Sequence, residues 1–227
     1  ADIKMPLTPQ AMATRVVTRM APQVSGKVVE VAVANNQHVK QGDLLFALDP
    51  EPFQLAVDQA RLALDQARQQ NRQLDATLTA YEAEYSSLRT QADQKQREAA
   101  RIDALYRRHM VSEQQKDDAD SAARTARANL LGSQARVEQA RVNRGLPGED
   151  NLLLRQARNR LAQAELNLAY SRVHASQDGI ITNLQLKPGS VANAGSPLLA
   201  LVSEQVDVIA DFREKSLRHV SAGSQAL

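Results

Sequence analysis

Side chains that could bind a metal ion are few and widely spaced in this sequence. The chain has no cysteine, which excludes disulfides and thiolate zinc sites. A zinc site needs three or four convergent ligands, and the histidine spacing suggests none: the four are His38, His109, His174 and His219. Met5, Met12 and Met20 offer soft thioether ligands for copper or silver, but isolated methionines are more typical of packing. We expect no metal site.

No pattern in the sequence is typical of an enzyme. It contains no nucleophile elbow, phosphate-binding loop or metal-binding helix motif. The acidic run KDDAD at residues 116–120 lacks the loop glycine and terminal glutamate of an EF-hand. We interpret it as the acidic first turn of a helix. We expect no catalytic residue and no cofactor.

Composition narrows the choice of protein class. Among 227 residues there are three Phe, four Tyr and no Trp, so little aromatic material is available for a compact core. The net charge of +2 comes from interspersed acidic and basic residues, which does not suit a nucleic-acid partner. No run approaches the ~18 apolar residues that span a bilayer. Because the chain starts at Ala1 without an initiator Met, we expect that a signal or membrane anchor was removed.

A long central region has the composition of helices. No glycine occurs between Gly42 and Gly132, and no proline between Pro52 and Pro147. Twelve of fourteen positions in a heptad register are apolar, against roughly six expected from composition, so we predict a coiled-coil seam. These positions are Val57, Ala60, Leu64, Ala67, Asn71, Leu74, Leu78, Tyr81, Tyr85, Leu88, Ala92, Lys95, Ala99 and Ile102. Two further seams follow, Ala119, Ala123, Ala126, Leu130, Ser133, Val137 and Ala140, then Leu154, Ala157, Leu161, Ala164 and Leu168.

A reversal of the chain is predicted between His109 and Ser112. Arg107 and Arg108 suit the negative end of a first helix, and Ser112 with Gln115 forms a capping box for the next. Each arm then has about 58 residues, roughly 85 Å at 1.5 Å per residue. The returning arm is interrupted at residues 145–151, where Asp150 or Asn151 could cap a new helix. This break should face Asn71, and we expect a kink or a loosened section there.

Two β-rich stretches bracket the helices and repeat each other. VSGKVVEVAVANNQHVKQGDLLFALD covers residues 24–49, and QDGIITNLQLKPGSVANAGSPLLALV covers residues 177–202. The spacing from Gly26 to Gly42 equals that from Gly179 to Gly195. Val28, Val31 and Val33 fall opposite Ile181, Leu184 and Leu186, with the alternation of half-buried strands. Each half is too short to bury an apolar face alone, so we predict one small β domain made of both.

The chain resembles the HlyD-like membrane fusion proteins, also called periplasmic adaptors, and more narrowly their multidrug-export branch paired with major-facilitator transporters. The resemblance rests on four phrases: APQVSG at residues 21–26, VKQGDLLFALDPEPF at 39–53, AQAELNLAYSRVHASQDG at 162–179 and VDVIADFREKSLRHVSAG at 206–223. Unlike lipoyl and biotinyl domains, the chain has the helical insertion where their modifiable lysine would lie, so no residue can serve as a swinging arm.

This resemblance implies an elongated α+β protein with a split lipoyl-like domain, also called a barrel-sandwich hybrid, an inserted coiled-coil hairpin and the start of a β-barrel. The expected boundaries are 1–23 for an N-terminal strand region leading from a membrane anchor, 24–50 and 171–203 for the lipoyl-like halves, 51–170 for the hairpin and 204–227 for the start of the barrel. Gly26, Gly42, Gly179 and Gly195 would be structural glycines of the halves.

The resemblance also implies partners and a docking site. Relatives that dock on TolC-type outer-membrane channels carry an Arg, a Leu four residues later and a Ser eleven residues after the Arg at the hairpin tip. Arg101, Leu105 and Ser112 have this spacing; the alternative is that they are respectively solvated, packed and a helix cap. The expected partners are an inner-membrane transporter of major-facilitator or ABC type, the channel, and further copies of the chain in a hexameric ring.

These features predict a periplasmic adaptor of a tripartite efflux system, anchored to the inner membrane of a Gram-negative bacterium and exporting drugs or other small molecules. Two alternatives stay open. The chain could be the adaptor of an ABC-type protein secretion system, or a coiled-coil envelope scaffold without a transport role. The scaffold hypothesis explains the heptads but not the bracketing β repeat.

Overall fold

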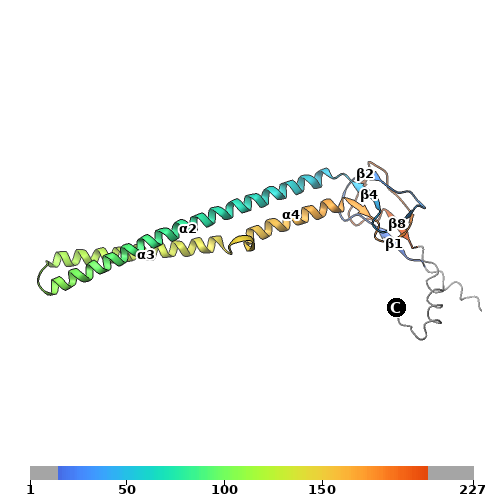
Figure 1. Ribbon diagram of the computed structural model, residues 1–227. Helices are drawn as coiled ribbons and strands as arrows, with labels where there is room; N and C mark the ends of the chain where they lie inside the picture. The colour runs from blue at the N-terminus through green and yellow to red at the C-terminus, as the bar shows by residue number, and fades with distance from the viewer. Residues whose placement is uncertain (1–14, 204–227) are drawn as a thin grey trace, which may run out of the picture. The chain divides into compact units, whose positions relative to one another are not determined.

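The computed structural model describes residues 15–203, which fall into two compact units (Figure 1). One is made of residues 15–58 and 162–203 and contains the β strands, and the other is made of residues 59–161 and is helical. The expected start of a β-barrel at 204–227, and residues 1–14 of the N-terminal region, lie outside the described residues.

The β unit is built from two four-stranded antiparallel sheets. One sheet has the order β1-β8-β6-β3 and the other the order β5-β4-β2-β7. The strands are β1 (Val17–Met20), β2 (Gly26–Val31), β3 (His38–Val39), β4 (Leu44–Leu48), β5 (Arg172–His174), β6 (Gly179–Thr182), β7 (Val191–Ala192) and β8 (Leu199–Val202). Strands from both predicted repeats are therefore present in each sheet.

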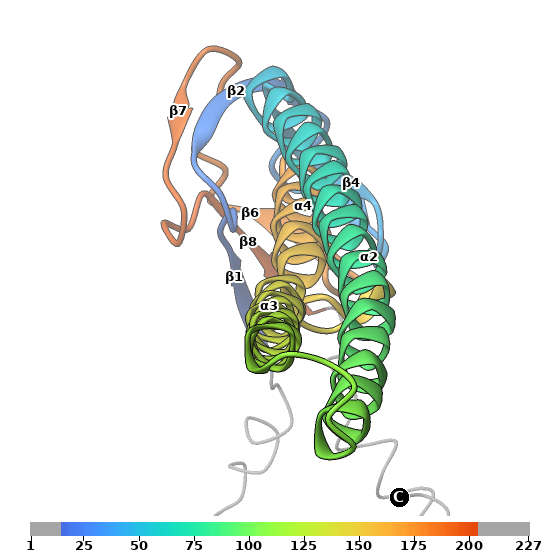
Figure 2. The same ribbon diagram turned by 90° about the vertical axis from the view of Figure 1, so that its left-hand side faces the viewer.

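The two repeats exchange short strands. β3 of the first repeat pairs with β6 of the second, with His38 opposite Ile180. In the same way β7 of the second repeat pairs with β2 of the first, with Gly26 opposite Ala192, and Figure 2 shows β7 beside β2. β1 and β5 complete the exchange, since β1 pairs with β8 and β5 with β4. This arrangement confirms the prediction of a single split β domain.

The core of this domain takes equivalent residues from both repeats. Val28, Val33 and Phe46 of the first repeat, and their counterparts Ile181, Leu186 and Leu199 of the second, all belong to one buried cluster. Burying a side chain of this size contributes roughly 1.5–3 kcal/mol. The regular strands are shorter than the alternation predicted: β2 has a register shift between Val28 and Glu30 and ends at Val31, although Val33 is buried beyond it.

Glycine is required at positions of the two repeats for different structural reasons, either a positive φ or the close approach of a neighbouring strand. Gly42 and Gly195 occupy equivalent turns with φ of 93° and 81°, a region that favours glycine. Gly179 has no positive φ, but a Cβ added to it would lie 2.8 Å from the carbonyl oxygen of Val202 in the neighbouring strand. A Cβ on Gly26 would meet Leu48 at 3.4 Å, an ordinary contact.

The pair Gly26 and Gly179 gives a direct test of this difference. Gly179→Ala should destabilise the β unit by about 1–3 kcal/mol, because β6 and β8 must separate to admit the methyl group. The matched change Gly26→Ala should alter stability by less than about 1 kcal/mol, since the methyl group has room. Both are measured by calorimetric unfolding; equal losses in the two variants would contradict the close approach at Val202.

The helical part of the chain has one uninterrupted arm and one interrupted arm. The first is α2 (Glu51–Arg107), and the returning arm is α3 (Glu113–Arg144), the 3-10 turn η1 (Gly148–Asp150) and α4 (Leu152–Tyr170). Where the arms leave and re-enter the β unit, the Leu48 amide donates to the Ser171 carbonyl at 2.7 Å. Within residues 15–203, no helix has the length and apolarity needed to cross a membrane.

All predicted seam positions are buried or half-buried, which confirms the coiled-coil seams. Leu64 packs with Leu154 and Ala157, and Leu78 packs with Val137 and Ala140. Ion pairs flank the second cluster, each worth about 0–1 kcal/mol. They are Asp75–Arg144 at 2.8 Å, Glu82–Arg141 at 3.4 Å and Glu84–Arg136 at 2.5 Å.

The polar seam residue Asn71 lies at the level of the break, as predicted. On α2, Arg68 pairs with Glu149 at 3.5 Å and Asp75 pairs with Arg144 at 2.8 Å, so residues on both sides of Asn71 contact the break. Asn71 is only 6% exposed, and its Oδ1 has no hydrogen-bond partner among the described residues. Such a residue lowers stability but helps to fix the register of a coiled coil.

The predicted interruption at residues 145–151 is present, but hydrogen bonds brace it, so of the expected kink or loosened section the loosening is wrong. Asn151 is 2% exposed, and its Nδ2 donates to the carbonyls of Arg144 at 2.7 Å and Leu146 at 2.9 Å. Its Oδ1 accepts from the Leu153 amide at 3.0 Å and caps α4. Arg158 donates to both the side chain and the carbonyl of Glu149. One asparagine thus satisfies backbone groups of both helix ends.

Substitutions of Asn151 can separate these two tasks. Asn151→Asp keeps the oxygen that caps α4 but cannot donate to the two carbonyls, so we expect a loss of about 2–3 kcal/mol. Asn151→Ser keeps a cap without adding a charge and should cost less than Asn151→Asp. Chemical denaturation measures the loss, and hydrogen exchange at Leu153 and Arg155 locates it. A stability of Asn151→Asp equal to the parent would show that the carbonyls need no side-chain donor.

Candidate functional site

The tip of the hairpin begins where α2 ends in a Schellman motif. The amide of Met110 donates to the carbonyl of Leu105 at 2.9 Å, and the amide of His109 donates to that of Tyr106 at 2.9 Å. His109 has φ of 60°, in the left-handed region where glycine is usual. Met110 follows it with 62% of its surface exposed. The motif closes the carbonyl end of α2 with backbone donors alone.

A capping box starts α3 on the other side of the turn, as the sequence predicts. The Ser112 hydroxyl accepts from the Gln115 amide at 3.1 Å, and the Gln115 side chain accepts from the Ser112 amide at 2.9 Å. The reversal therefore needs only residues 108–112 between the two helices. Backbone groups at both helix ends are thus hydrogen-bonded within the turn, which gives the tip a defined conformation.

Lys116 joins the two arms just behind the tip. Its Nζ donates to Asp120 at 2.8 Å, lies 3.9 Å from Asp103 of α2 and sits 5.8 Å from the centroid of the Tyr106 ring. The hydrogen bond to Asp120 and the charges of Asp120, Asp103 and Asp117 raise the pKa of Lys116, against a smaller desolvation effect. Local sequence patterns could not predict that Lys116 connects the two arms, because its partners on α2, Asp103 and Tyr106, belong to the other helix.

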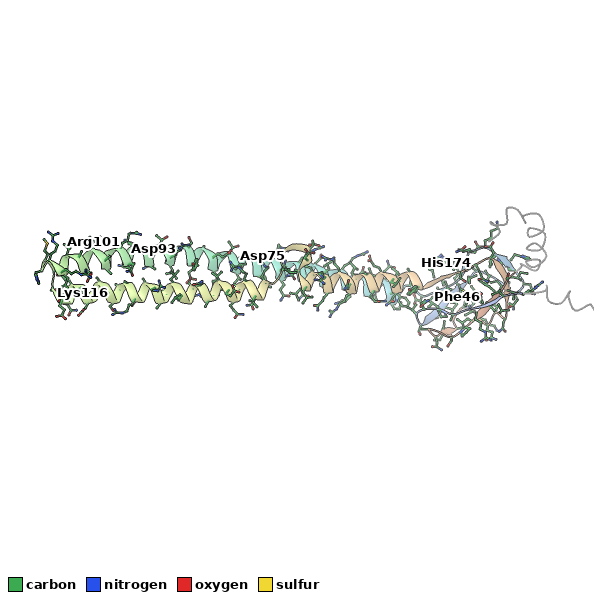
Figure 3. All side chains as sticks on the ribbon, turned by 90° about the horizontal axis from the view of Figure 1, so that it is seen from below. Phe46, Asp75, Asp93, Arg101, Lys116 and His174 are labelled. Atoms are coloured by element: carbon green, nitrogen blue, oxygen red, sulfur yellow. The ribbon has the colours of Figure 1, made fainter. Side chains whose placement is uncertain are left out.

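The three predicted docking residues differ in exposure. Arg101 is exposed on α2, Leu105 is half-buried one turn later, and Ser112 is exposed at the start of α3. Figure 3 shows Arg101 and Lys116 near the turn, with Asp93 and Asp75 farther from it. The Leu105 carbonyl and the Ser112 hydroxyl are both engaged in the turn. The patch offers a guanidinium donor, an apolar surface and a hydroxyl.

Elsewhere, the described residues offer little that could hold a ligand. Residues 15–203 contain no group of three or more His, Cys, Asp or Glu placed to bind a metal. A depression in the β unit is lined by polar groups such as His38, Lys40 and Asp178, and the Asp178 side chain accepts from the Gln41 amide at 2.8 Å. The hairpin tip is therefore the better candidate for a functional surface.

Comparison with known proteins identifies relatives that match nearly the whole chain. Residues 15–204 match the family model described as RND MFP, barrel-sandwich hybrid domain. The chain is 32% identical to multidrug resistance protein MdtN of Escherichia coli O6:H1 over 231 residues, covering 97% of this chain and 67% of MdtN. It is also 32% identical to fatty acid resistance protein FarA of Neisseria gonorrhoeae, covering 92% of this chain and 54% of FarA.

A solved structure also aligns with the chain. That of the periplasmic adaptor protein EmrA covers 83% of this chain and 72% of its own, at 17% identity and a TM-score of 0.48. The match to the family model includes both β repeats and the whole hairpin between them. The chain therefore belongs to the membrane fusion protein family, with the barrel-sandwich hybrid domain of its RND-type members.

Proposed function

We propose that this chain is the periplasmic adaptor subunit of a tripartite efflux system, linking an inner-membrane transporter to a TolC-type outer-membrane channel. The observation that carries the proposal is the hairpin. α2 alone has 57 residues, about 85 Å at 1.5 Å per residue, and it ends in a tip that both helix caps define. A helix pair of this length with a thin seam buries little surface for its size, which suits a spacer between partners.

The exported molecules are proposed to be drugs or other small molecules. The names of two relatives support this, since MdtN is a multidrug resistance protein and FarA a fatty acid resistance protein. We propose a major-facilitator transporter as the partner, on the resemblance carried by residues 21–26, 39–53, 162–179 and 206–223. The matching family model is described as RND and does not mention major-facilitator transporters. The proposed class of transporter therefore rests on the sequence resemblance alone. Adaptors of ABC-type secretion are the alternative.

The proposed role is mechanical and not enzymatic. The chain would be held at the inner membrane by a segment outside the described residues, in the periplasm of a Gram-negative bacterium, with several copies around one axis. Partners would be the transporter, the channel and other adaptor copies, without nucleic acid. Supporting this, the described residues present an exposed helical tip and a braced hairpin.

Arg101, Leu105 and Ser112 are proposed to contact the channel. Arg101→Glu reverses a charge on an exposed side chain, so unfolding should change by no more than about 0.5 kcal/mol. Channel crosslinking from Met110→Cys should nevertheless fall at least about tenfold, and drug resistance with it, because a guanidinium that meets acceptors becomes a repelled carboxylate. These 227 residues contain no cysteine, so Met110→Cys adds the one crosslinking site among them.

Arg89→Glu is the matched control for this experiment. Arg89 is an exposed arginine on the same helix, twelve residues or about 18 Å farther from the tip. The Arg89→Glu variant should crosslink to the channel and confer drug resistance as strongly as the parent. If Arg101→Glu also crosslinks and exports as the parent does, docking belongs to other residues.

Ser112 needs a separate test because it is also a helix cap. Ser112→Ala should cost about 1 kcal/mol through loss of the cap, lowering the melting temperature by roughly 2–4 °C. Ser112→Asp should keep the cap and the melting temperature, yet weaken crosslinking to the channel by placing a charge in the patch. Full crosslinking by Ser112→Asp would mean that Ser112 acts only as a cap.

A further inference from the structure

The outer face of α2 lacks the charges that a solvent-facing helix normally carries. Ten exposed positions along α2 follow a second heptad register, on the side away from the seam. Nine of the 34 residues from 61 to 94 are charged, and none of the nine falls on these positions. The ten are Leu62, Gln66, Gln69, Gln73, Ala76, Ala80, Ala83, Ser87, Thr90 and Gln94. We name them the α2 face.

The returning arm has a matching outer face. Seven exposed positions of α3 repeat with the same alternating spacing of four and three residues, and none is charged, although five of the 22 residues from 121 to 142 are. They are Ser121, Thr125, Ala128, Gly132, Ala135, Gln139 and Val142, which we name the α3 face. Large apolar side chains also stand exposed on the two faces, Leu62 at 63% and Val142 at 67%. Two arms thus have an unpartnered heptad face each.

Nothing among residues 15–203 explains why position 132 in the α3 face is a glycine. It lies in the middle of a helix, where glycine is among the poorest helix formers. Its φ is not positive, and a Cβ built on it would meet nothing within 4 Å. Its small size would be explained by a helix of another molecule that approaches closely at this level. Because Arg136 pairs with Glu84 across the antiparallel arms, position 132 is level with position 88, next to Ser87 of the α2 face.

Charges at the tip determine which faces can meet. Arg97 and Arg101, both exposed, continue the α2 face toward the turn, whereas Asp117 and Asp118 are exposed at the start of α3. An α2 face against another α2 face would bring like charges together, which is unfavourable. Because Arg136 pairs with Glu84, position 101 is level with position 119, so an α2 face against an α3 face at equal height would bring Arg101 to Asp118. Charge complementarity therefore favours a head-to-tail contact, the kind that closes into a ring.

We propose that the α2 face of one copy packs against the α3 face of the next copy at equal height, with Gly132 accommodating the neighbouring helix near its Ser87. The partner is a second copy of this chain. The inference rests on the proposed function only in placing adaptor copies around one axis. It adds which helix faces meet, in which direction, and where the closest approach lies.

Cysteine crosslinking in cells producing the full-length adaptor with its partners tests this contact. Within one chain, Ser87 and Ala135 lie on faces that point away from the shared seam. A variant with both Ser87→Cys and Ala135→Cys should give a ladder of dimers, trimers and larger species, because each copy carries both sides. Each single variant should stay monomeric. Leu62→Cys with Ala135→Cys is the mismatched control, shifted by about 37 Å along the same face.

A second change probes the close approach itself. Gly132→Leu, added to the double-cysteine variant, should raise the melting temperature of the purified protein by about 2–4 °C, since leucine is a better helix former. The ladder should nevertheless fall at least about tenfold. Gln134→Leu is the control, an exposed position of the same helix outside the face, and should keep the ladder.

The outcomes separate this inference from the proposed function. Absence of a ladder in cells whose drug resistance depends on the adaptor would overturn the lateral contact while keeping the export role. Crosslinking of either single variant as strong as that of the pair would show a symmetric contact, and an equal ladder from the mismatched pair would show random collision; both overturn the proposal. A ladder in cells without adaptor-dependent resistance would keep the contact and reject the export role.

Discussion

The exchange of short strands between the two β repeats is the constraint on which the rest of the molecule depends. Without β7 the sheet of β2 and β4 lacks an outer strand, and without β3 the sheet of β6 and β8 lacks one. The repeats are separated by more than 120 residues of sequence, so the inserted helices must return the chain to its starting point. The hydrogen bond from Leu48 to Ser171 shows that they do.

The hairpin achieves this return with a seam in which alanines are interspersed with larger apolar residues. Its cross-arm ion pairs are largely exposed and individually weak, so they adjust the register more than they create it. Specific alignment comes from polar residues at the break. Asn71 disfavours alternative registers because it is buried and unsatisfied, and Asn151 fixes the backbone opposite it. The buried Asn71 thus lowers the stability of the hairpin but favours a single register between its two long arms.

Most of this architecture could be predicted because it depends on repeats and motifs that span few residues. Glycine spacing gave the β repeat, heptads gave the three seams, and Ser112 with Gln115 gave the turn. Local patterns could not give the strand exchange, because pairing between β3 and β6 depends on residues about 140 apart. The same reason explains Lys116, whose partner Asp103 lies on the other arm.

The heptad seams limit how hairpins of this kind can change in length. Seven residues added to α2 and seven to the returning arm keep every seam position facing its partner and lengthen the arm by about 10 Å. Insertions of other sizes rotate one helix against the other and locally wind or unwind the coil. The reach of such a spacer therefore changes in steps of one heptad per arm, and families that bridge compartments of different width should differ by multiples of that step.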